Sequence, residues 1–536
     1  MPQIAHTIFI NAKIFTANPA QPFAQAVAVR GNRIAFVGNN ADALAWRGEG
    51  TRVIDAQNNT LLPGINDAHY HLLHGSLRLN GILLGEARVH EQVVHTIKKF
   101  ASEHPEREWL SGSQLLYNAG PAHAPLTRHH LDAIISDRPI VILAYDGHTA
   151  WANTNALRRA GILRGGECGP NSEIVLDEHG DATGELREPG AFRQITNLLP
   201  KPDANRKRAL LHKGLRQAAE LGVTSVQNMD ARDDLPLLAA ALEDVGELTL
   251  RVYLPYDITP KTKFEELATR AVAMRNEYAS EMVRAGSVKF FMDGVIEAYT
   301  GLLIEPYADK PDTTGDANYT LEHFNRMAVE ADRLGFQIFT HAIGDLAMRR
   351  TLDGYELAQK TNGKRDSRHR VEHIELIHLD DIARFSGLDV IASMQPLHAP
   401  LAADGLDVWT QRVGEARWGL SFAWETLRQA NARLVFGSDW PVVTQNPFLG
   451  IHHAVNRKPW RPHLPEQKQT LQNTLLAYTR DAAYAEFQEH HKGQVRENFL
   501  ADLVLVNADM FRAPPETLGE MKPLVTMCDG RIVYEA

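Results

Sequence analysis

The chain has 536 residues, of which 44% are hydrophobic and 23% charged, and its net charge is −10. This composition is typical of a soluble globular protein, and the length exceeds what one small core needs. A mildly acidic chain with scattered basic residues argues against nucleic acid and against an anionic membrane as partners. The sequence contains no apolar stretch of roughly 20 residues, no secretory signal pattern and only two cysteines, Cys168 and Cys528. We therefore expect a cytoplasmic protein without disulfides.

Both ends of the chain are predicted to be β-structure. HTIFINAKIFTAN and FAQAVAVRGNRIAFVG near the N-terminus include a Gly-Asn turn signal, and the tail holds ADLVLVNAD and LVTMCDGRIVYEA. Neither end has enough strands to bury a core by itself. We therefore expect residues 1–60 and 486–536 to form one composite β-sandwich, beside a central domain of residues 61–485.

The central part alternates apolar segments with stretches of helical spacing. Eight of these segments are predicted strands: Thr60–Ala68, Gly222–Met229, Leu248–Tyr256, Gly286–Met292, Phe336–Thr340, Arg370–Ile374, Asp389–Met394 and Ala432–Gly437. Strand–helix alternation through eight repeats favours an α/β fold of the (β/α)8 type, a TIM barrel, over an open sheet.

The interval between the first two predicted strands is unusually long. Residues 77–205 far exceed an ordinary βα loop. They contain a strand signal, RPIVILAYD, and a helix signal that begins after Asn153 and ends at Gly161. A loop that leaves the C-terminal end of a barrel strand lies over the active face. We therefore expect this insertion to be a lid or substrate subdomain, with His148 and Trp151 as substrate-binding residues.

Histidines and a carboxylate lie in or at the C-terminal ends of several predicted strands. His69 and His71 are one residue apart, so a strand directs both imidazoles toward the same ion. His341 closes the run QIFT, His373 closes HRVE, and Asp439 follows LVFGS. The C-terminal ends of barrel strands meet at one face, where catalytic groups gather. The pattern therefore predicts a metal site.

Lys289 is a further candidate ligand. It lies between Val288 and Phe290 in SVKFF, which indicates burial. Burial of an ammonium group is costly unless the group is paired, and it lowers the pKa. A neutral lysine amine can take up carbon dioxide to form a carbamate, whose oxygens can bridge two metal ions. The alternative is an ion pair with Asp293, Glu297 or another carboxylate at the barrel rim.

The ordered motifs resemble the amidohydrolase superfamily, and within it the YtcJ-like group with the N-substituted formamide deformylases (amidohydrolase family 3). The matching blocks are LLPGINDAHYHL, DGHTAWANTNALRRAGI, DATGELRE, GVTSVQNMD, SVKFFMDG, THAIGDLAM, RVEHIEL, SMQPLHA, FGSDWPV, ADLVLVN and GRIVY. This resemblance covers nearly the whole chain. It implies one or two divalent ions, usually zinc, on a (β/α)8 barrel flanked by a β-sandwich. The matching metal ligands are His69, His71, Lys289 as the carboxylated lysine, His341, His373 and Asp439.

The chain departs from this group after SVKFFMDG. It continues VIEAYTGLLIEPY, where the group commonly has a small, Ser-rich segment that ends in Thr-Ala. Glu297 and Tyr299 therefore alter a wall near the metals. This departure leaves the substrate open, but it touches no ligand.

The expected activity is hydrolysis of a C–N bond in a small-molecule amide, of the N-acyl or N-formyl type, by metal-activated water. Asp439 would act as general base and then as general acid. His148 and His398 are the candidates to polarise the carbonyl and to contact the substrate.

Several alternatives remain open at this stage. The same site would serve a deaminase or a cyclic amide or imide hydrolase, and its ligands also suit manganese, iron or cobalt. A non-catalytic regulatory protein would retain the fold, because fold does not fix function. A sugar-cleaving barrel would need paired acids at strand ends, and only Asp439 and Asp293 qualify. The assembly is also open, with a homodimer as one option.

Overall fold

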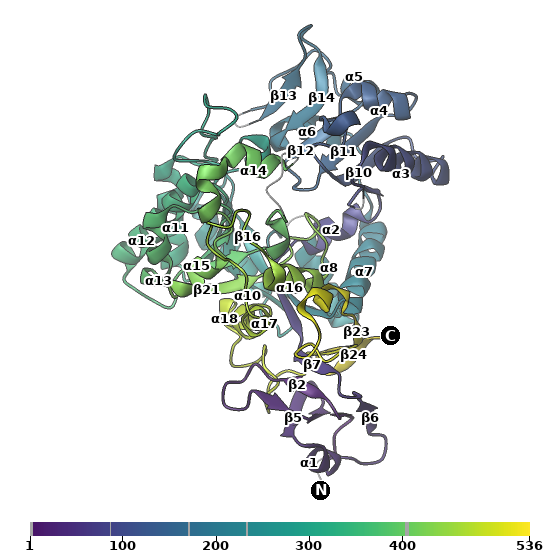
Figure 1. Ribbon diagram of the computed structural model, residues 1–536, viewed down its shortest axis with the longest axis vertical. Helices are drawn as coiled ribbons and strands as arrows, with labels where there is room; N and C mark the ends of the chain where they lie inside the picture. Colours follow the sequence, from purple (N-terminus) through teal and green to yellow (C-terminus); the bar gives the residue numbers. More distant parts are fainter. Residues whose placement is uncertain (1–3, 86, 170–171, 232–233, 402–406) are drawn as a thin grey trace.

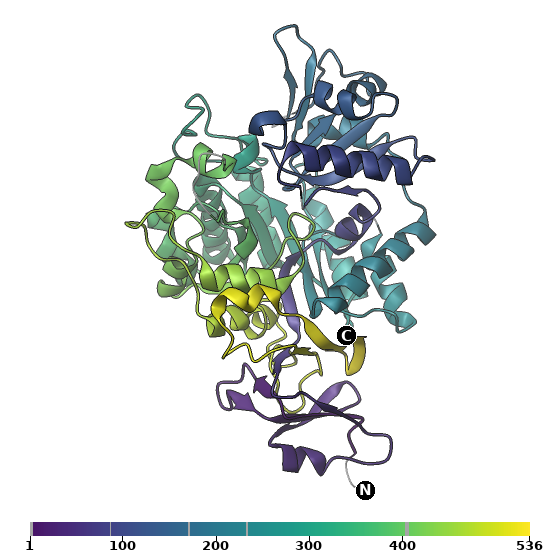
Figure 2. The same cartoon turned by 45° about the vertical axis from the view of Figure 1, so that its right-hand side comes forward.

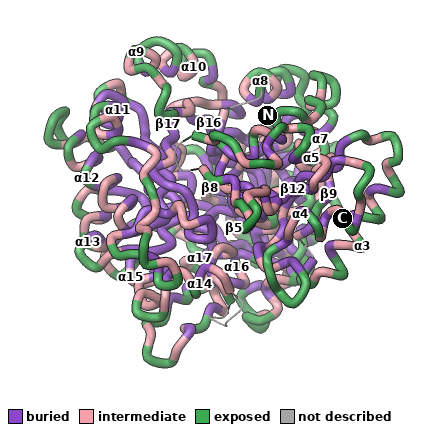
Figure 3. Tube along the Cα trace, turned by 90° about the horizontal axis from the view of Figure 1, so that it is seen from above, coloured by how far each residue is buried: buried purple, intermediate pink, exposed green. Residues whose placement is uncertain are grey.

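The computed structural model describes residues 4–85, 87–169, 172–231, 234–401 and 407–536. The chain is arranged in three parts along its long axis, with a β-sandwich at one end, a barrel in the middle and the insertion at the other end (Figure 1). Seen from above, the buried residues gather toward the centre and the exposed ones follow the outer helices (Figure 3). None of the described helices is long and apolar enough to cross a membrane.

The middle part confirms the predicted α/β fold. Its eight strands run parallel in the order β21-β20-β19-β18-β17-β16-β15-β8. They are β8 (Ile65–Tyr70), β15 (Val223–Asn228), β16 (Arg251–Asp257), β17 (Val283–Phe291), β18 (Gln337–Ala342), β19 (Arg370–His373), β20 (Ile391–Met394) and β21 (Arg433–Phe436).

Helices between the strands and after the last strand cover the barrel. They include α7 (Ala204–Glu220), α8 (Leu235–Asp244), α10 (Val272–Glu277), α11 (Leu321–Arg333), α12 (Asp345–Asn362), α13 (Leu379–Gly387), α15 (Trp424–Gln429), α16 (Pro447–Asn456), α17 (Leu471–Ala477) and α18 (Arg480–Ala485). Several begin at a side-chain cap. The Asp203 carboxylate accepts from the backbone N–H of Arg206, and the Thr320 hydroxyl accepts from that of His323. Such caps satisfy N–H groups that a helix cannot pair internally.

The first predicted strand, Thr60–Ala68, divides into two strands in different sheets. Thr60–Pro63 forms β7, which belongs to the β-sandwich, and β8 begins at Ile65. Gly64 joins them, and a Cβ at Gly64 would lie 2.1 Å from the hydroxyl of Thr224. Only a glycine therefore allows the chain to pass this close to β15 as it enters the barrel.

The barrel closes where the segment after β21 meets β8. The backbone N–H of Asp439 donates to the carbonyl of His69 at 2.7 Å. One oxygen of the buried Asp67 carboxylate accepts from the N–H groups of His69 (3.1 Å) and Ser438 (2.9 Å). A Cβ at Gly437 would lie 2.4 Å from the backbone nitrogen of His69. The closure therefore requires a glycine directly after β21 and a buried carboxylate on β8.

Strands from both ends of the chain share one sheet of the β-sandwich. This six-stranded sheet has the order β24-β23-β22-β7-β2-β3, and a four-stranded sheet has the order β5-β4-β1-β6. The first consists of β2 (Lys13–Phe15), β3 (Phe23–Ala24), β7, β22 (Leu503–Val506), β23 (Pro523–Cys528) and β24 (Arg531–Glu535). The second consists of β1 (Thr7–Ile10), β4 (Ala26–Arg30), β5 (Arg33–Gly38) and β6 (Arg52–Asp55), with α1 (Asn40–Leu44) beside it. Antiparallel pairing of β7 with β22 joins the two ends.

The insertion is an α/β unit with its own core. Its six-stranded sheet has the order β13-β14-β12-β11-β10-β9. The strands are β9 (Ile82–Leu83), β10 (Leu110–Leu115), β11 (Ile140–Ala144), β12 (Thr149–Ala152), β13 (Glu173–Leu176) and β14 (Ala182–Arg187). The helices α3 (His90–Glu103), α4 (Arg128–Ile134), α5 (Thr154–Arg159) and α6 (Glu188–Thr196) pack around it. The predicted N-cap of α5 is present, since the Asn153 side chain accepts from the N–H of Ala156 at 2.9 Å.

Replacement of Gly437 by alanine should weaken the barrel closure, because the new methyl group would collide with the backbone of His69. The expected loss of stability is about 1–3 kcal/mol, as for other overpacked sites. Thermal unfolding of Gly437→Ala and Gly387→Ala provides the comparison, since a Cβ at Gly387 meets no atom within 4 Å. Equal melting temperatures for the two variants would contradict the role of this close approach.

Candidate metal centre

All six predicted ligands lie in or just after barrel strands, at their C-terminal ends. His69 is in β8, and His71 follows that strand and caps α2 (Leu72–Arg78). β8 runs from the β-sandwich up toward the insertion (Figure 2), so its end faces that unit. The others follow in chain order: Lys289 in β17, His341 in β18, His373 at the end of β19 and Asp439 just after β21.

The centre of the site is the Asp439 carboxylate. Its Oδ1 atom lies 3.4 Å from Nε2 of His69 and 3.2 Å from Nε2 of His71. Its Oδ2 atom lies 3.9 Å from Nδ1 of His373 and 3.7 Å from Nε2 of His398. Oδ1 is buried and makes no hydrogen bond within the described chain. A buried carboxylate oxygen between two imidazole nitrogens is the donor set that a divalent cation fits.

Two groups of ligand atoms therefore share Asp439. His69, His71 and Asp439 form one, and His373, His398 and Asp439 form the other, each with ligand atoms within 4.8 Å of one another. His341 lies beside them, with its ring 4.5 Å from the ring of His373. Its Nε2 donates to the carbonyl of Gly294 at 2.9 Å, which leaves Nδ1 as the nitrogen with a lone pair. His398, expected only at the substrate, thus stands close enough to be a ligand.

Lys289 is fully buried and has no carboxylate within ion-pair distance among the described residues. Its ammonium lies 3.7 Å from the sulfur of Met229 and 4.8 Å from the centre of the Phe291 ring. The proposed partners are engaged elsewhere: Asp293 accepts backbone N–H groups, and Glu297 accepts from the hydroxyl of Tyr145. Burial lowers the pKa of Lys289 to about 8. A substantial fraction of the amine is therefore neutral near pH 8.

Carboxylate or amide groups bind the Nδ1 atoms of three histidines. Nδ1 of His69 lies 2.7 Å from Oε2 of Glu372, Nδ1 of His71 contacts Asp230, and Nδ1 of His373 lies 2.9 Å from Oε1 of Gln395. In a neutral ring, an acceptor that holds the proton on Nδ1 leaves Nε2 with the lone pair that a metal needs. Sequence reasoning missed these partners, although Glu372 directly precedes His373.

Glu372 is itself fixed by a buried arginine. The Arg370 guanidinium donates to both Glu372 oxygens at 2.8 and 2.9 Å, to the carbonyl of Ala68 at 2.5 Å and to the hydroxyl of Ser393 at 2.8 Å. Both charged side chains are completely buried. Burial would raise the pKa of Glu372, but Arg370 and His69 hold it well below its usual range. The carboxylate therefore stays ionised as it holds His69.

The electrostatics favour the protonation states that metal ligands need at Asp439, His341 and His373, whereas at His71 burial is outweighed by the carboxylates of Asp230 and Asp439, which raise the pKa to about 9. Burial alone would raise the pKa of Asp439, but the neighbouring His69, His71 and His373 hold it well below its usual range. Burial and neighbouring positive charges place the pKa values of His341 and His373 well below the ordinary value. At neutral pH the carboxylate is charged and these two imidazoles are neutral.

The insertion supplies a second wall of the site. His148 follows β11, and its Nδ1 lies 3.0 Å from Oε2 of Glu188, which also accepts from the hydroxyl of Thr300 on the barrel at 2.5 Å. The His148 ring is 5.8 Å from the ring of His341. The structure thus brings His148 to the metal ligands. Trp151 lies behind this wall, fully buried, with its ring 5.3 Å from that of Tyr117.

His398 is held from the barrel side. It ends a short helical turn (Pro396–His398) after β20, and its ring stacks on His373 at 5.7 Å. Its Nδ1 lies 3.4 Å from one oxygen of Glu375, and the other oxygen accepts from the indole of Trp409 at 2.7 Å. The buried Nε2 makes no hydrogen bond in the described structure and is directed toward Asp439.

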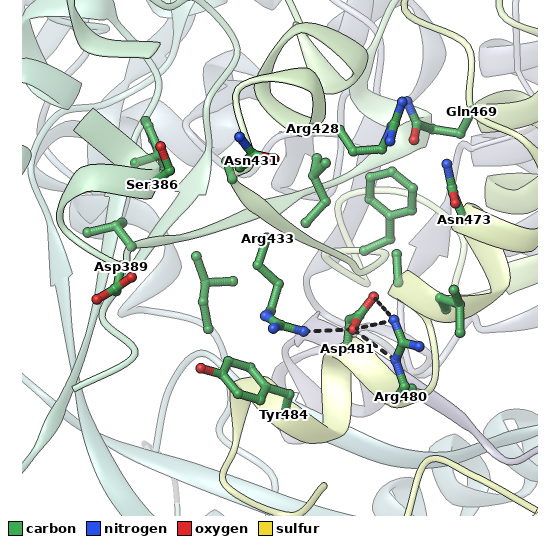
Figure 4. Close-up of a pocket in the computed structure, with 18 residues that line it drawn as sticks. Ser386, Asp389, Arg428, Asn431, Arg433, Gln469, Asn473, Arg480, Asp481 and Tyr484 are labelled. Carbon is green, nitrogen blue, oxygen red and sulfur yellow. Dashed lines mark hydrogen bonds and ion pairs between the residues drawn. The ribbon is translucent and has the colours of Figure 1, made fainter. Parts of the chain in front are cut away.

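A cavity of about 400 Å³ lies away from this centre, between α13, α17 and α18 and the outer side of β21 (Figure 4). Its lining includes Arg433, the first residue of β21, so it is near the opposite end of the strand from Asp439. Arg433 and Arg480 both pair with Asp481, at 2.9 and 3.2 Å. None of the metal-site histidines lines this cavity, so it is separate from the metal centre.

Residues 52–534 match the amidohydrolase family, and the chain belongs to this family of hydrolases. The predicted family is thereby confirmed.

Three curated relatives extend over most of the chain. Protein LONG AFTER FAR-RED 3 of Arabidopsis thaliana is 29% identical, over 94% of this chain and 88% of that protein. Putative amidohydrolase YtcJ of Bacillus subtilis is 27% identical over 90% and 91%, respectively. N-substituted formamide deformylase of Arthrobacter pascens is 25% identical over 100% and 99%. A crystal structure of an uncharacterized metal-dependent hydrolase from Pyrococcus horikoshii shares the fold, with a TM-score of 0.73, 23% identity and coverage of 96% of this chain and 99% of that chain.

Replacement of Glu372 by glutamine should loosen His69 and lower the affinity for a divalent metal about 10- to 100-fold, the usual effect of losing such a partner. Metal affinity can be measured by competition with a chelator. The matched control is Glu489→Gln, which removes a carboxylate paired with Arg368 away from the ligands. An unchanged affinity in folded Glu372→Gln protein would show that Glu372 does not position the ligand.

Proposed function

We propose that the protein is a metal-dependent amidohydrolase that cleaves the C–N bond of a small-molecule amide of the N-acyl or N-formyl type. The observation that carries this proposal is the buried Asp439 oxygen, which lies between the Nε2 atoms of His69 and His71 without a hydrogen bond. The similarity to a formamide deformylase and to YtcJ supports the choice of bond.

The residues that would hold the metal are His69, His71, Lys289, His341, His373 and Asp439. Zinc is the proposed ion, in one or two copies, because imidazole and carboxylate donors suit it. When bound, such an ion supplies Lewis-acid chemistry, since it lowers the pKa of water to about 7 and polarises a carbonyl group.

Asp439 is the proposed proton carrier. Its carboxylate would accept a proton from the attacking water and transfer it to the leaving nitrogen. A carboxylate with a low pKa is ionised at neutral pH, which is the state a base needs. His148 and His398 would orient the carbonyl group of the substrate from opposite walls of the site. Glu188 fixes Nδ1 of His148, and Glu375 fixes Nδ1 of His398.

Lys289 is proposed to carry a carbamate. Carbamate formation needs a neutral amine, and burial lowers the pKa of this lysine to about 8. Among the described residues, the buried ammonium of Lys289 has no counter-charge within ion-pair distance, and carboxylation would replace it with an anion that metal ions can neutralise.

The main alternatives keep the same site. A deaminase or a cyclic amide or imide hydrolase would use the same ligands on another substrate. A regulatory protein that retains the barrel has less support, because the full set of six ligand residues is present. We place amide hydrolysis first and the other C–N substrates second.

Asp439→Asn tests the proposed activity directly. Asparagine keeps the size and can still offer an oxygen to the metal, but it cannot accept a proton. On metal-replete protein, turnover of N-formyl and N-acyl amides should fall by ~10²–10⁴-fold, with a smaller change in KM. Near wild-type turnover would remove Asp439 from the role of proton carrier. No amide hydrolysis by metal-loaded wild-type protein would refute the proposed function itself.

Lys289→Ala tests the carbamate. The variant should lose metal and activity, and a short carboxylic acid in the buffer should restore part of both by occupying the vacated space. Lys289→Arg is the matched variant, because a guanidinium keeps its proton and forms no carbamate. Full activity and metal content in Lys289→Arg would show that the residue serves only as a cation.

A further inference from the structure

Arg78 extends toward the metal centre from the helix that follows the His-x-His segment. It is the last residue of α2, which begins directly after His71. Side chains on a helix point back toward its N-terminus. Accordingly, Nε of Arg78 donates to Nε2 of His74, one turn back, at 3.2 Å, and the rings of His74 and His71 are 6.1 Å apart. The guanidinium therefore lies on the metal-centre side of its helix.

The insertion meets the guanidinium from the other side. A Cβ placed on Gly147 would lie 3.1 Å from the Nη2 atom of Arg78. Gly147 immediately precedes His148, which faces His341 at the metal centre. Arg78 consequently occupies the junction between the barrel and the insertion, next to the residue that the insertion contributes to the site.

Most N–H groups of this guanidinium have no partner among the described residues. Only Nε makes a hydrogen bond, and Nη1 is buried without one. Burial lowers the pKa of Arg78 to about 10, against the attraction of Asp439 and Asp146, so the group remains a cation at neutral pH. Neither carboxylate is within ion-pair distance. The Arg78 side chain as a whole is partly buried, but its Nη1 is a buried donor, and such a donor is costly unless a ligand or water satisfies it.

Several buried arginines of the chain are paired with carboxylates, whereas Arg457 donates to backbone carbonyls instead. Arg251 donates to Asp502 at 2.7 Å, Arg370 to Glu372 at 2.8 Å and Arg128 to Asp177 at 3.1 Å. Arg78 has the same charge next to the metal ligands without such a partner. Because Nε is occupied by His74, the Nη1 and Nη2 groups remain for a ligand.

We infer that Arg78 binds a carboxylate of the substrate, so that the preferred substrates are N-formyl or N-acyl compounds that carry a carboxylate, such as N-acylated amino acids. This inference rests on the proposed function, whose scissile amide would lie over the metal ligands while the carboxylate reaches Arg78. A guanidinium presents two parallel N–H groups that match a carboxylate. A phosphate would place a second negative charge near Asp146 and Asp439, which favours the singly charged carboxylate.

The test uses substrate pairs that differ only in the carboxylate. Metal-loaded protein is assayed on N-formyl and N-acetyl derivatives of several amino acids and on the same derivatives of their decarboxylated amines, such as leucine and 3-methylbutylamine. Wild-type protein should favour the acid in kcat/KM by about 10- to 100-fold, the effect of a hydrogen-bonded charge pair. Arg78→Gln should abolish this preference. The matched control, Arg206→Gln, removes an exposed arginine that donates to Asn80 near α2, and it should retain the preference.

A binding measurement separates this inference from the proposed function. Calorimetric titration with the free amino acid and with its decarboxylated amine should show tighter binding of the amino acid to wild-type protein and the loss of that difference in Arg78→Gln. If wild-type protein hydrolyses no amide, the proposed function fails and the titration alone decides the role of Arg78. Equal kcat/KM for acid and neutral substrates, or equal binding of amino acid and amine by wild-type protein, overturns the inference.

Discussion

The buried carboxylate of Asp67 is the interaction on which the site depends most directly. It accepts N–H groups from both sides of the closing seam, from His69 on β8 and from Ser438 after β21. The same contact that closes the barrel therefore places Asp439 beside His69. Burial raises the pKa of Asp67 to about 7, although these hydrogen bonds oppose the shift. Barrel closure and the position of Asp439 relative to His69 therefore depend on the same carboxylate.

The interior of the barrel is polar where an ordinary core would be apolar. Arg370, Glu372 and Gln227 lie within it, completely buried, and link β15, β19 and β8 through hydrogen bonds. Buried ion pairs contribute little net stability compared with apolar packing. Their value here is orientation, because Glu372 fixes one nitrogen of His69. Arg370 and Glu372 thus hold His69 in place, and removal of either charge would leave the other buried and unpaired.

Much of the architecture was predictable from the sequence because it depends on local patterns. Apolar runs that end in His69, His341, His373 or Asp439 identify parallel strands, and the barrel rule then brings their ends together. The break at Gly64 was missed, although Pro63-Gly64 is a turn signal within the run from Thr60 to Ala68, and the contact with Thr224 explains why the residue there is glycine. The ligand-supporting residues were also missed, because Asp230, Glu372 and Gln395 find their histidines only through tertiary packing.

The insertion packs around its own sheet yet touches the barrel through a few polar contacts, such as Tyr145 with Glu297 and Glu188 with Thr300. The barrel and the insertion therefore have separate apolar cores. Under the proposed function, separate cores would let substitutions in the insertion reshape the wall around His148 while the barrel that carries the metal ligands keeps its packing.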